Sequence, residues 1–480
     1  MLTSNNKVLL IVPPVSIEDI YGGLAEAGAV APPLNLLLLA AIIRKRGYAP
    51  NIIDSPARGW GYGRILEEIR TLQPMAVGIT AMTPHVAQMA KLCKTIKKHF
   101  ESIPVIVGGV HISAVPEATM QRFPCIDIGV IGAAEETLVE LLDALTQHTD
   151  IGNTAGIIFR RNGHLVQTLP RKELLELDSL PLFAWDLLPD FPVSYPPALF
   201  ATHRTPATPI LTSRGCHGRC IFCFSGCHKT VSTHSADYIF NTLSHLKHTY
   251  GIREFMIYDD CFVMYKSNLK ILLQRLIDSK LDMTWSCNAR VDLVDEELLS
   301  LMARAGCWNI GFGIESGNQG IIDRLQKKIT KERILAALTS SKKCGIRTVG
   351  YFMIGHFGET PETIEETIRF AISLPLDEMR MSFFTPLPGT EAMKEASSYG
   401  AFNQDAWEDM NLFAPVFIPT GMTKDYLLRK QKEALRRFYF RPRIAWEFLK
   451  ITRDPLVILQ ASKILFQYLF SQKSTKKAHS

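Results

Sequence analysis

The chain has 480 residues, which exceeds one ordinary domain and predicts two or three. Hydrophobic residues make up 47% and charged residues 21%, a balance that excludes a disordered or collagen-like protein. The net charge is +6, and the excess of positive charge lies in the C-terminal segment. Residues Lys424 to Ser480 contain 14 Lys or Arg against 4 Asp or Glu. Since the rest of the chain is slightly acidic, no nucleic-acid partner is expected.

The N-terminus carries no charged segment followed by an apolar run, so a secretion signal is not expected. The apolar stretch from Leu34 to Ile43 is about half as long as a membrane span. The sequence therefore predicts a cytoplasmic protein without a transmembrane helix. In that compartment clustered cysteines are metal ligands or nucleophiles rather than disulfide partners.

Residues 1–150 alternate short apolar runs with longer amphipathic stretches, which predicts a doubly wound, Rossmann-like α/β domain with a parallel sheet. The expected strands are Lys7–Val12, Ala49–Asp54, Met75–Thr80, Val105–Gly108 and Ile126–Val130. Such sheets bind ligands beyond the carboxyl ends of their strands, where Asp54, Thr80, Gly108 and Gly109 fall.

Residues 151–206 are expected to form a hairpin and a linker. The β-rich runs between Ile157 and Leu169 flank Asn162-Gly163, a pair typical of a type I′ turn. The proline-rich passage from Leu180 to Pro209 resembles a linker that ends the first domain.

Residues 207–395 resume the alternation and predict a partial or complete (β/α) barrel, with its chemistry at the carboxyl ends of the strands. The expected strands are Ile210–Ser213, Glu254–Tyr258, Thr284–Asn288, Asn309–Ile314, Thr348–Ile354 and Met379–Phe384. Residues 396–480 are expected to be a basic helical region with no further strands.

A cysteine triplet follows the first barrel strand. Cys216, Cys220 and Cys223 form a CxxxCxxC array. Three thiolates on one loop can hold three irons of a [4Fe-4S] cubane and leave the fourth iron open. The alternative is zinc, which requires four ligands, with Cys227 or His217 as the fourth.

The triplet, with Phe222 just before its last cysteine, resembles the radical S-adenosylmethionine (SAM) superfamily. The resemblance implies that the open iron binds SAM and that one electron cleaves it to methionine and a 5′-deoxyadenosyl radical. It also implies an electron donor such as flavodoxin or ferredoxin. No catalytic acid or base stands out in the sequence.

Later strand ends carry elements that resemble the same superfamily in the expected order. Arg290, in Cys287-Asn288-Ala289-Arg290, is predicted to pair with the methionine carboxylate through its guanidinium fork. Gly313 and Glu315 follow the fourth strand, and Glu315 is predicted to accept hydrogen bonds from a ribose or amino group. Gly355 lies in an element that resembles the glycine-containing segment near the adenine.

The first domain resembles the cobalamin-binding domains that precede the barrel in one branch of this superfamily. Asp54-Ser55-Pro56-Ala57-Arg58-Gly59 matches the frame of the DxHxxG motif but has Pro56 where the cobalt-binding histidine belongs. Proline has no metal-binding group, so cobalt is expected to lack a histidine from this position. A flavodoxin-like domain that binds nothing is the alternative.

The function that this resemblance implies is cobalamin-dependent C-methylation of a small, apolar lipid or polycyclic substrate. Cobalamin-dependent cyclisation, oxidation or ring rearrangement without methyl transfer stays open. A protein of another class, which senses cobalamin or redox state, is a further alternative.

The basic tail interleaves cations with aromatic residues from Tyr426 to Phe470. Such helices can lie in a membrane interface, which predicts peripheral contact at the inner face of the membrane. An ordinary amphipathic helix that packs on the barrel is the alternative.

Overall fold

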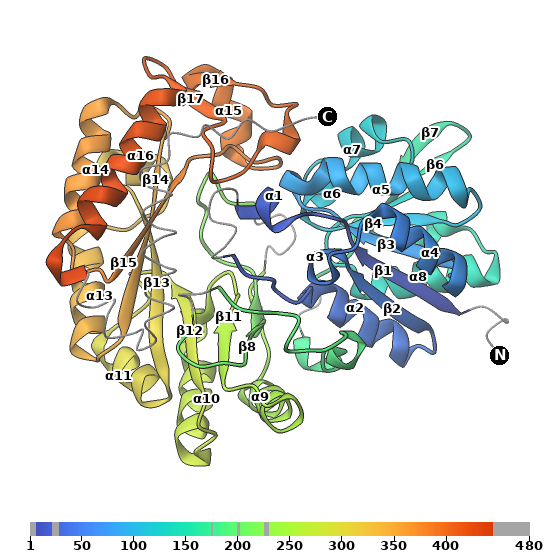
Figure 1. Cartoon of the computed structure of the whole chain (residues 1–480), viewed down its shortest axis with the longest axis horizontal. Helices are drawn as coiled ribbons and strands as arrows, with labels where there is room; N and C mark the ends of the chain where they lie inside the picture. Colours follow the sequence, from blue (N-terminus) through green and yellow to red (C-terminus); the bar gives the residue numbers. More distant parts are fainter. Residues whose placement is uncertain (1–5, 22–27, 174–175, 199–201, 225–229, 445–480) are drawn as a thin grey trace.

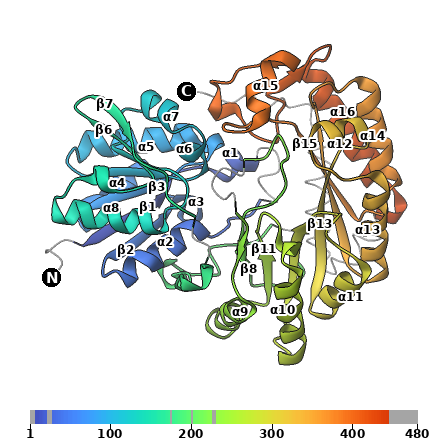
Figure 2. The same ribbon diagram turned by 180° about the vertical axis from the view of Figure 1, so that it is seen from behind.

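The computed structural model describes residues 6–21, 28–173, 176–198, 202–224 and 230–444. Two α/β units lie beside each other, and the region that follows the second unit reaches back toward the first (Figure 1). The view from behind shows the same arrangement (Figure 2).

The first unit contains a seven-stranded sheet of order β2-β1-β3-β4-β5-β6-β7. Its parallel strands are β1 Lys7–Val12, β2 Ala49–Asp54, β3 Ala76–Thr80, β4 Val105–Gly108 and β5 Ile128–Val130. Successive side chains of β1 pack in different hydrophobic cores, on opposite faces of the sheet. Leu10 packs beneath α2 (Leu34–Lys45) and α8 (Glu135–Gln147), and Leu9 packs beneath α4 (Tyr62–Leu72) and α5 (Val86–His99). The doubly wound sheet predicted from the sequence is confirmed.

The predicted hairpin extends this sheet. Strands β6 (Ile157–Arg161) and β7 (His164–Gln167) are antiparallel, and β6 pairs with β5. Asn162 and Gly163 have φ angles of 51° and 81°. Because a type I′ turn requires positive φ at both central residues, the predicted turn is confirmed. The sheet thus continues beyond residue 150.

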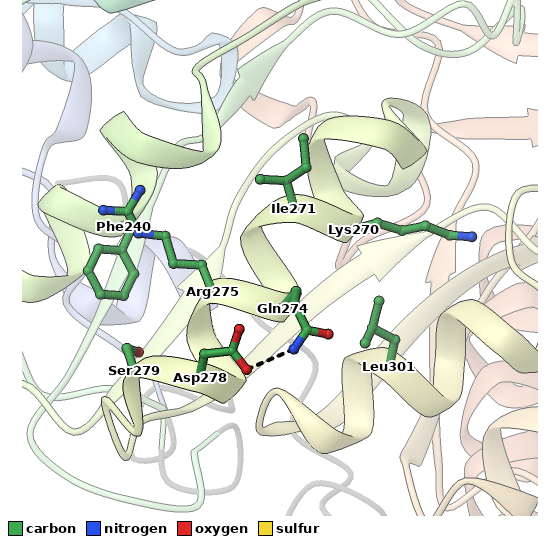
Figure 3. A pocket seen from close by; sticks show the side chains of 8 residues that line it. All are labelled: Phe240, Lys270, Ile271, Gln274, Arg275, Asp278, Ser279 and Leu301. Carbon is green, nitrogen blue, oxygen red and sulfur yellow. Dashed lines mark hydrogen bonds between the residues drawn. The ribbon is translucent and has the colours of Figure 1, made fainter.

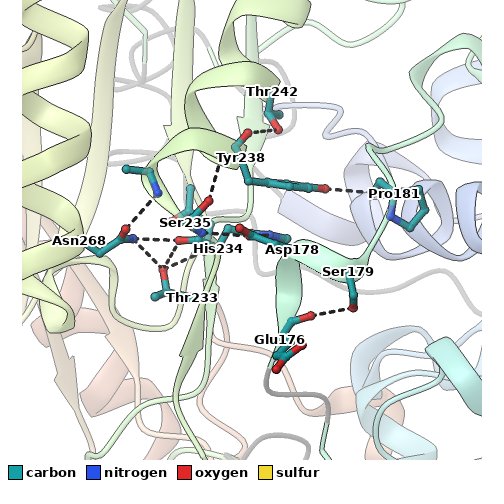
Figure 4. Close-up of polar contacts among 12 residues, drawn as sticks. Glu176, Asp178, Ser179, Pro181, Thr233, His234, Ser235, Tyr238, Thr242 and Asn268 are labelled. Carbon is teal, nitrogen blue, oxygen red and sulfur yellow. Dashed lines mark hydrogen bonds and ion pairs between the residues drawn. The ribbon is translucent and has the colours of Figure 1, made fainter.

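The proline-rich connection is fixed to the second unit by polar contacts (Figure 4). Asp178 Oδ1 accepts hydrogen bonds from the backbone N–H of Ser235 and from Nδ1 of His234, at 3.0 and 3.1 Å. Burial lowers the pKa of His234 to about 4, so the neutral ring makes this contact. The Tyr238 hydroxyl donates to the carbonyl of Pro181 at 3.0 Å. Asp178 and Pro181, at the start of the connection, are therefore held against the second unit.

The second unit is an open, partial barrel of six parallel strands in the order β15-β14-β13-β12-β11-β8. The strands are β8 Ala207–Ile210, β11 Glu254–Ile257, β12 Thr284–Ala289, β13 Cys307–Glu315, β14 Arg347–Ile354 and β15 Glu378–Phe383. The first strand was expected at Ile210–Ser213, which is wrong. Pro209 is accommodated within β8 because β8 is an edge strand, where a missing N–H leaves no ladder bond unmade.

Helices cover the outer face of the barrel sheet (Figure 1). Large outward side chains such as Phe255, Trp285 and Phe312 are buried in this layer. The helices are α9 Ala236–Tyr250, α10 Lys266–Ser279, α11 Glu296–Arg304, α12 Gln319–Arg324, α13 Lys331–Lys343, α14 Pro361–Ser373 and α16 Lys424–Tyr439.

The region after the barrel differs from the wholly helical prediction. After α15 (Glu391–Tyr399), β16 (Gly400–Phe402) pairs antiparallel with β17 (Phe417–Pro419). On α16, Gln431 and Tyr439 donate to the carbonyls of Met381 and Met379 on β15, at 2.7 and 2.9 Å. None of the helices in the described ranges is long and apolar enough to cross a membrane. Residues 445–480, most of the predicted basic tail, lie outside those ranges.

Candidate functional site

The cysteine loop is held at its start by two carboxylates that follow β11. Asp259 accepts hydrogen bonds from Thr212 N–H and Oγ1, at 2.7 and 2.5 Å, and from Ser213 Oγ at 2.7 Å. Asp260 accepts from the Gly215 N–H at 3.0 Å. Burial raises the pKa of Asp259 to about 6, against the lowering effect of these bonds. The residue next to Cys216 is therefore fixed to the neighbouring strand end.

The middle of the loop is held by backbone bonds. The Ile221 N–H donates to the Leu325 carbonyl at 3.2 Å, and the Ile221 carbonyl accepts from Ala392 at 2.9 Å. Phe222 is half-buried against the apolar cluster that contains Ile221 and Phe357. Phe222 thus anchors the segment that ends in Cys223.

Cys216, Cys220 and Arg290 converge at Gly218. A Cβ at Gly218 would lie 3.3 Å from Cys216 Sγ, 3.5 Å from Arg290 Nη1 and 3.9 Å from Cys220 Sγ. A hydrogen bond with Cys261 and one from the Gly218 N–H lower the pKa of Cys216. Arg290 lowers it further, so one thiol is biased toward the thiolate form that binds metal.

The guanidinium fork of Arg290 is already engaged. Its Nε and Nη2 each donate to a carboxylate oxygen of Asp292 at 3.0 Å, and Nη2 also donates to the Lys327 carbonyl at 2.7 Å. The remaining terminal nitrogen, Nη1, lies near Gly218 and the thiols of Cys216 and Cys220. The predicted fork with a methionine carboxylate therefore requires Asp292 to give way, or a single bond from Nη1.

Glu315 lies at the end of β13 with a φ of 68°, in the left-handed region. Its carboxylate forms an ion pair with Lys327, and the two side chains are only 9% and 8% exposed. A Cβ at Gly313 would lie 2.5 Å from Lys327 Nζ and 2.6 Å from Glu315 Oε1, so the ion pair crosses the glycine. Burial raises the pKa of Cys220, and the positive charge of Lys327 opposes part of this rise. The pair thus connects the β13 end to the cysteine loop.

Gly355 opens a tight turn after β14. Its φ is 88°, and its N–H and that of His356 donate to Glu359 Oε2 at 2.5 and 2.9 Å. Burial raises the pKa of Glu359 to about 7. This buried carboxyl fixes the turn that carries Gly355.

The predicted ligand edge of the first sheet is formed by three strand ends. Asp54 is buried and accepts a hydrogen bond from the Ala57 N–H at 3.4 Å, capping the short helix α3 (Ser55–Arg58), and burial raises its pKa to about 6. The Thr80 hydroxyl accepts from Asn35 at 3.0 Å. Gly109 has a φ of 113°, and a Cβ there would lie 2.7 Å from the Ala81 carbonyl oxygen. Only glycine permits this approach of the β3 and β4 ends.

The cysteine loop and the first unit meet at Gly389, in the loop after β15. A Cβ at Gly389 would lie 2.7 Å from the Phe224 ring and 2.9 Å from Ala114, on α6 (Val110–Ala114) of the first unit. Arg214, which precedes the loop, forms a 2.6 Å ion pair with Glu135 at the start of α8. The site therefore spans both units.

Two family models match these two units in order. The radical SAM superfamily matches residues 210–371, and the B12 binding domain matches residues 22–142. An uncharacterized methyltransferase of Pyrococcus horikoshii is 31% identical, over 91% of this chain and 93% of its own length. The chain belongs to the cobalamin-binding radical SAM family. The [4Fe-4S] cluster, SAM and cobalamin predicted from the sequence are confirmed as the cofactors of this radical SAM enzyme.

Two more proteins are similar along most of the radical SAM enzyme. The anaerobic magnesium-protoporphyrin IX monomethyl ester cyclase of Rubrivivax gelatinosus is 26% identical, over 90% of this chain and 77% of its own. The solved structure of the radical SAM methyltransferase TsrM from Kitasatospora setae shares the fold, with a TM-score of 0.69 and 20% identity. That match covers 82% of this chain and 75% of that one.

The donor set at the loop fits a cubane cluster. The three thiols on one loop provide the ligands. The nearby cations Arg290 and Lys327 balance the negative charge of the thiolates. Within the described residues, no group of three His, Cys, Asp or Glu converges on a single metal ion. A cubane places its ligands on different irons and needs no such convergence. Cys227, named for the zinc site, lies outside the described residues.

The edge of the first unit offers glycine backbone and exposed apolar side chains rather than a cobalt ligand from α3. Gly132 has a φ of 75°, and no atom of the described residues lies within 4 Å of a Cβ built there. Met82 and Val110 are exposed beside the strand ends. Pro56 lies in the first turn of α3, so this helix offers no ligand where the motif has histidine. His111 is fully buried against Thr83 and Trp407.

A surface pocket of about 810 Å³ lies among α9, α10 and α11, outside the sheet (Figure 3). Its polar groups pair locally, Arg275 with Asp237 and Gln274 with Asp278. Because the pocket lies on the helical layer outside the sheet and no residue of the cysteine loop lines it, the pocket is not part of the site.

The sequence reasoning missed five residues that organise the site. Asp259 and Asp260 directly follow the strand predicted at Glu254–Tyr258 but were given no role, and Asp292 was not considered. Lys327 gave no local signal, because its partner Glu315 precedes it by a full helix. Glu135 was given no role in the site, whereas it pairs with Arg214 across the two units.

Proposed function

We propose that this enzyme transfers a methyl group to an unactivated carbon, with SAM as the methyl source and cobalamin as the carrier. The meeting of Phe224, Gly389 and Ala114 is the observation that supports it, because the cysteine loop there touches the edge of the cobalamin-binding unit. The methyltransferase relatives are consistent with this proposal. When bound, the cofactors supply reductive cleavage of SAM and delivery of its methyl group.

The chain's own residues hold and orient these groups. We propose Cys216, Cys220 and Cys223 as cluster ligands, with Phe222 fixing their loop. Arg290 Nη1 provides positive charge beside the thiols, and we propose that the buried pair of Glu315 and Lys327 contacts SAM.

The remaining SAM and cobalamin contacts are proposed from backbone shape. We propose that the backbone of the turn at Gly355 contacts the adenosyl group, and that Gly313 contributes by letting the Glu315–Lys327 pair lie across β13. Asp54 supports the cobalamin edge through α3, and Thr80, Gly108 and Gly109 line it. A flavodoxin or ferredoxin is the proposed electron donor, and the reacting part of the substrate is proposed to be apolar.

Methyl-deuterated SAM tests the proposal. The enzyme, reconstituted anaerobically with cluster and cobalamin, is incubated with reductant and a small-molecule extract of its source cells. Label is expected first on cobalamin and then in a product three mass units heavier than the unlabelled one. A product without label excludes methylation, and complete absence of 5′-deoxyadenosine would favour the sensing function.

A second candidate is cobalamin-dependent cyclisation or oxidation without methyl transfer. The relative from Rubrivivax gelatinosus, named a cyclase, supports it because the similarity spans both units. The same assay separates the two, since cyclisation yields 5′-deoxyadenosine and an unlabelled product.

We also propose peripheral membrane contact for the segment after Ile444. Helix α16 itself packs on the barrel, with Leu427, Ala434 and Phe438 buried, so it behaves as the ordinary amphipathic helix. A truncation after Ile444 is expected to lose flotation with anionic liposomes, whereas the full chain floats. Equal flotation of both would remove the membrane proposal.

A further inference from the structure

The barrel sheet has two chemically different faces. On β14 and β15, Phe352 and Met381 are buried beneath the helical layer, whereas their neighbours Tyr351 and Arg380 point to the opposite face. That inner face is turned toward the first unit in both views (Figures 1 and 2). Tyr351 and Arg380 are directly paired across the two strands.

Arg380 presents unused donors on this inner face. Its Nε donates to Glu378 Oε1 at 2.6 Å, and its guanidinium lies 5.7 Å from the centre of the Tyr351 ring. The side chain is 50% exposed, and its two terminal nitrogens make no hydrogen bond with a described residue. These nitrogens therefore remain available for a ligand.

The charge around Arg380 is positive. Arg347 Nη2 donates to the other oxygen of Glu378 at 2.7 Å. Although burial raises it, the charges of Arg380 and Arg347 lower the pKa of Glu378 to about 2. Two guanidinium groups thus face one ionised carboxylate, which leaves a net positive charge.

Asn288 completes a row of polar groups across the sheet. The Tyr351 hydroxyl donates to Asn288 Oδ1 at 3.1 Å, over β13. A Cβ at Gly311 would lie 2.4 Å from that oxygen and 2.6 Å from the Tyr351 ring, so glycine lets both side chains lie across the strand. Asn288 is exposed, and its amide nitrogen donates to no described residue.

We propose that the row of Asn288, Tyr351 and Arg380 binds a carboxylate or phosphate group of the substrate. Guanidinium forks recognise both groups by paired, charge-assisted hydrogen bonds. Tyr351 precedes the end of β14 by three residues, which places the anionic group ~10 Å from the strand ends at 3.3 Å per residue. The inference rests on the proposed function and refines its substrate class to an anionic compound with an apolar reacting part.

Matched probes test this binding. Equilibrium dialysis of the reconstituted holoenzyme compares 3-phenylpropionate, phenethyl phosphate and the neutral 3-phenylpropanamide at low salt. At least one anionic probe is expected to bind about tenfold more tightly than the amide, as for a charged hydrogen-bonded pair. The more strongly bound of the two anionic probes identifies the group. Equal binding of all three would overturn the proposal.

Two variants assign the preference to Arg380. Arg380→Gln is expected to abolish it and Arg380→Lys to retain part of it, which distinguishes loss of charge from misfolding. The control is Arg369→Gln, an exposed arginine on α14 that bonds only its own helix, and it is expected to bind like the unaltered enzyme. A full preference in Arg380→Gln would contradict the assignment. Dialysis needs no turnover, so its outcome is separate from the methyl-label assay.

Discussion

Removal of the Lys327 ammonium is expected to destabilise the barrel strongly. In Lys327→Met the Glu315 carboxylate stays buried, 9% exposed, without its cation. Breaking a buried ion pair on one side reduces stability by about 3–5 kcal/mol. At ~2–4 °C per kcal/mol for a unit of this size, the melting temperature should fall by about 6–20 °C. Thermal unfolding followed by circular dichroism measures this shift.

A double variant separates the charge effect from packing. Glu315→Gln combined with Lys327→Met removes both charges, so it should be more stable than Lys327→Met alone. Lys331→Met is the matched control, because its partner Glu366 is 36% exposed and such pairs contribute ~1 kcal/mol or less. The reasoning is refuted if Lys327→Met melts within 1 °C of this control, or if the double variant shows the sum of both single losses.

Three further substitutions test the supports of the site. Asp259→Asn should weaken the start of the cysteine loop by about 1–3 kcal/mol, because one amide oxygen replaces a carboxylate with three donors, and iron bound per chain should fall. Glu359 has a folded pKa of about 7 against 4.5 unfolded, so the enzyme loses stability as pH rises between these values. Glu359→Gln lacks this loss and should be more stable by about 1–3 kcal/mol at pH 8 in denaturant unfolding, with a smaller difference at pH 5. Glu135→Gln should speed proteolysis between residues 151 and 206, since it breaks the ion pair between units.

Each of these has a matched comparison. Asp278→Asn alters an α10 carboxylate that bonds only Gln274, and it should leave iron content unchanged. Glu136→Gln, at a 59% exposed position beside Glu135, should not alter proteolysis. Equal iron content in Asp259→Asn and Asp278→Asn would contradict the role of Asp259. A pH-independent effect of Glu359→Gln would contradict the pKa argument. Equal cleavage of Glu135→Gln and Glu136→Gln would contradict the role of the ion pair between units.

Sequence patterns predicted correctly those elements whose conformation depends on residues close together in the chain. The β-branched runs of the first domain lie in a buried parallel sheet, which requires apolar residues on both faces. Asn162-Gly163 specified its turn because only residues that tolerate positive φ fit there. The cysteine spacing located the loop and its place after a strand.

Long-range pairings lay beyond such rules. The strands β16 and β17 have three residues each and are joined by a long irregular segment, so no periodic pattern marks them. The position of β8 depended on its being an edge strand, which is a property of the assembled sheet. The contacts of Glu315 with Lys327 and of Glu135 with Arg214 join residues that only tertiary packing brings together.

Helix α16 has a consequence for the solution behaviour of the protein. An open barrel leaves the outer edge of β15 with unpaired peptide groups, which form a template for strand addition between molecules. Gln431 and Tyr439 of α16 donate hydrogen bonds to the carbonyls of Met381 and Met379 on that edge. A chain that ends before Thr423 should therefore self-associate through β15.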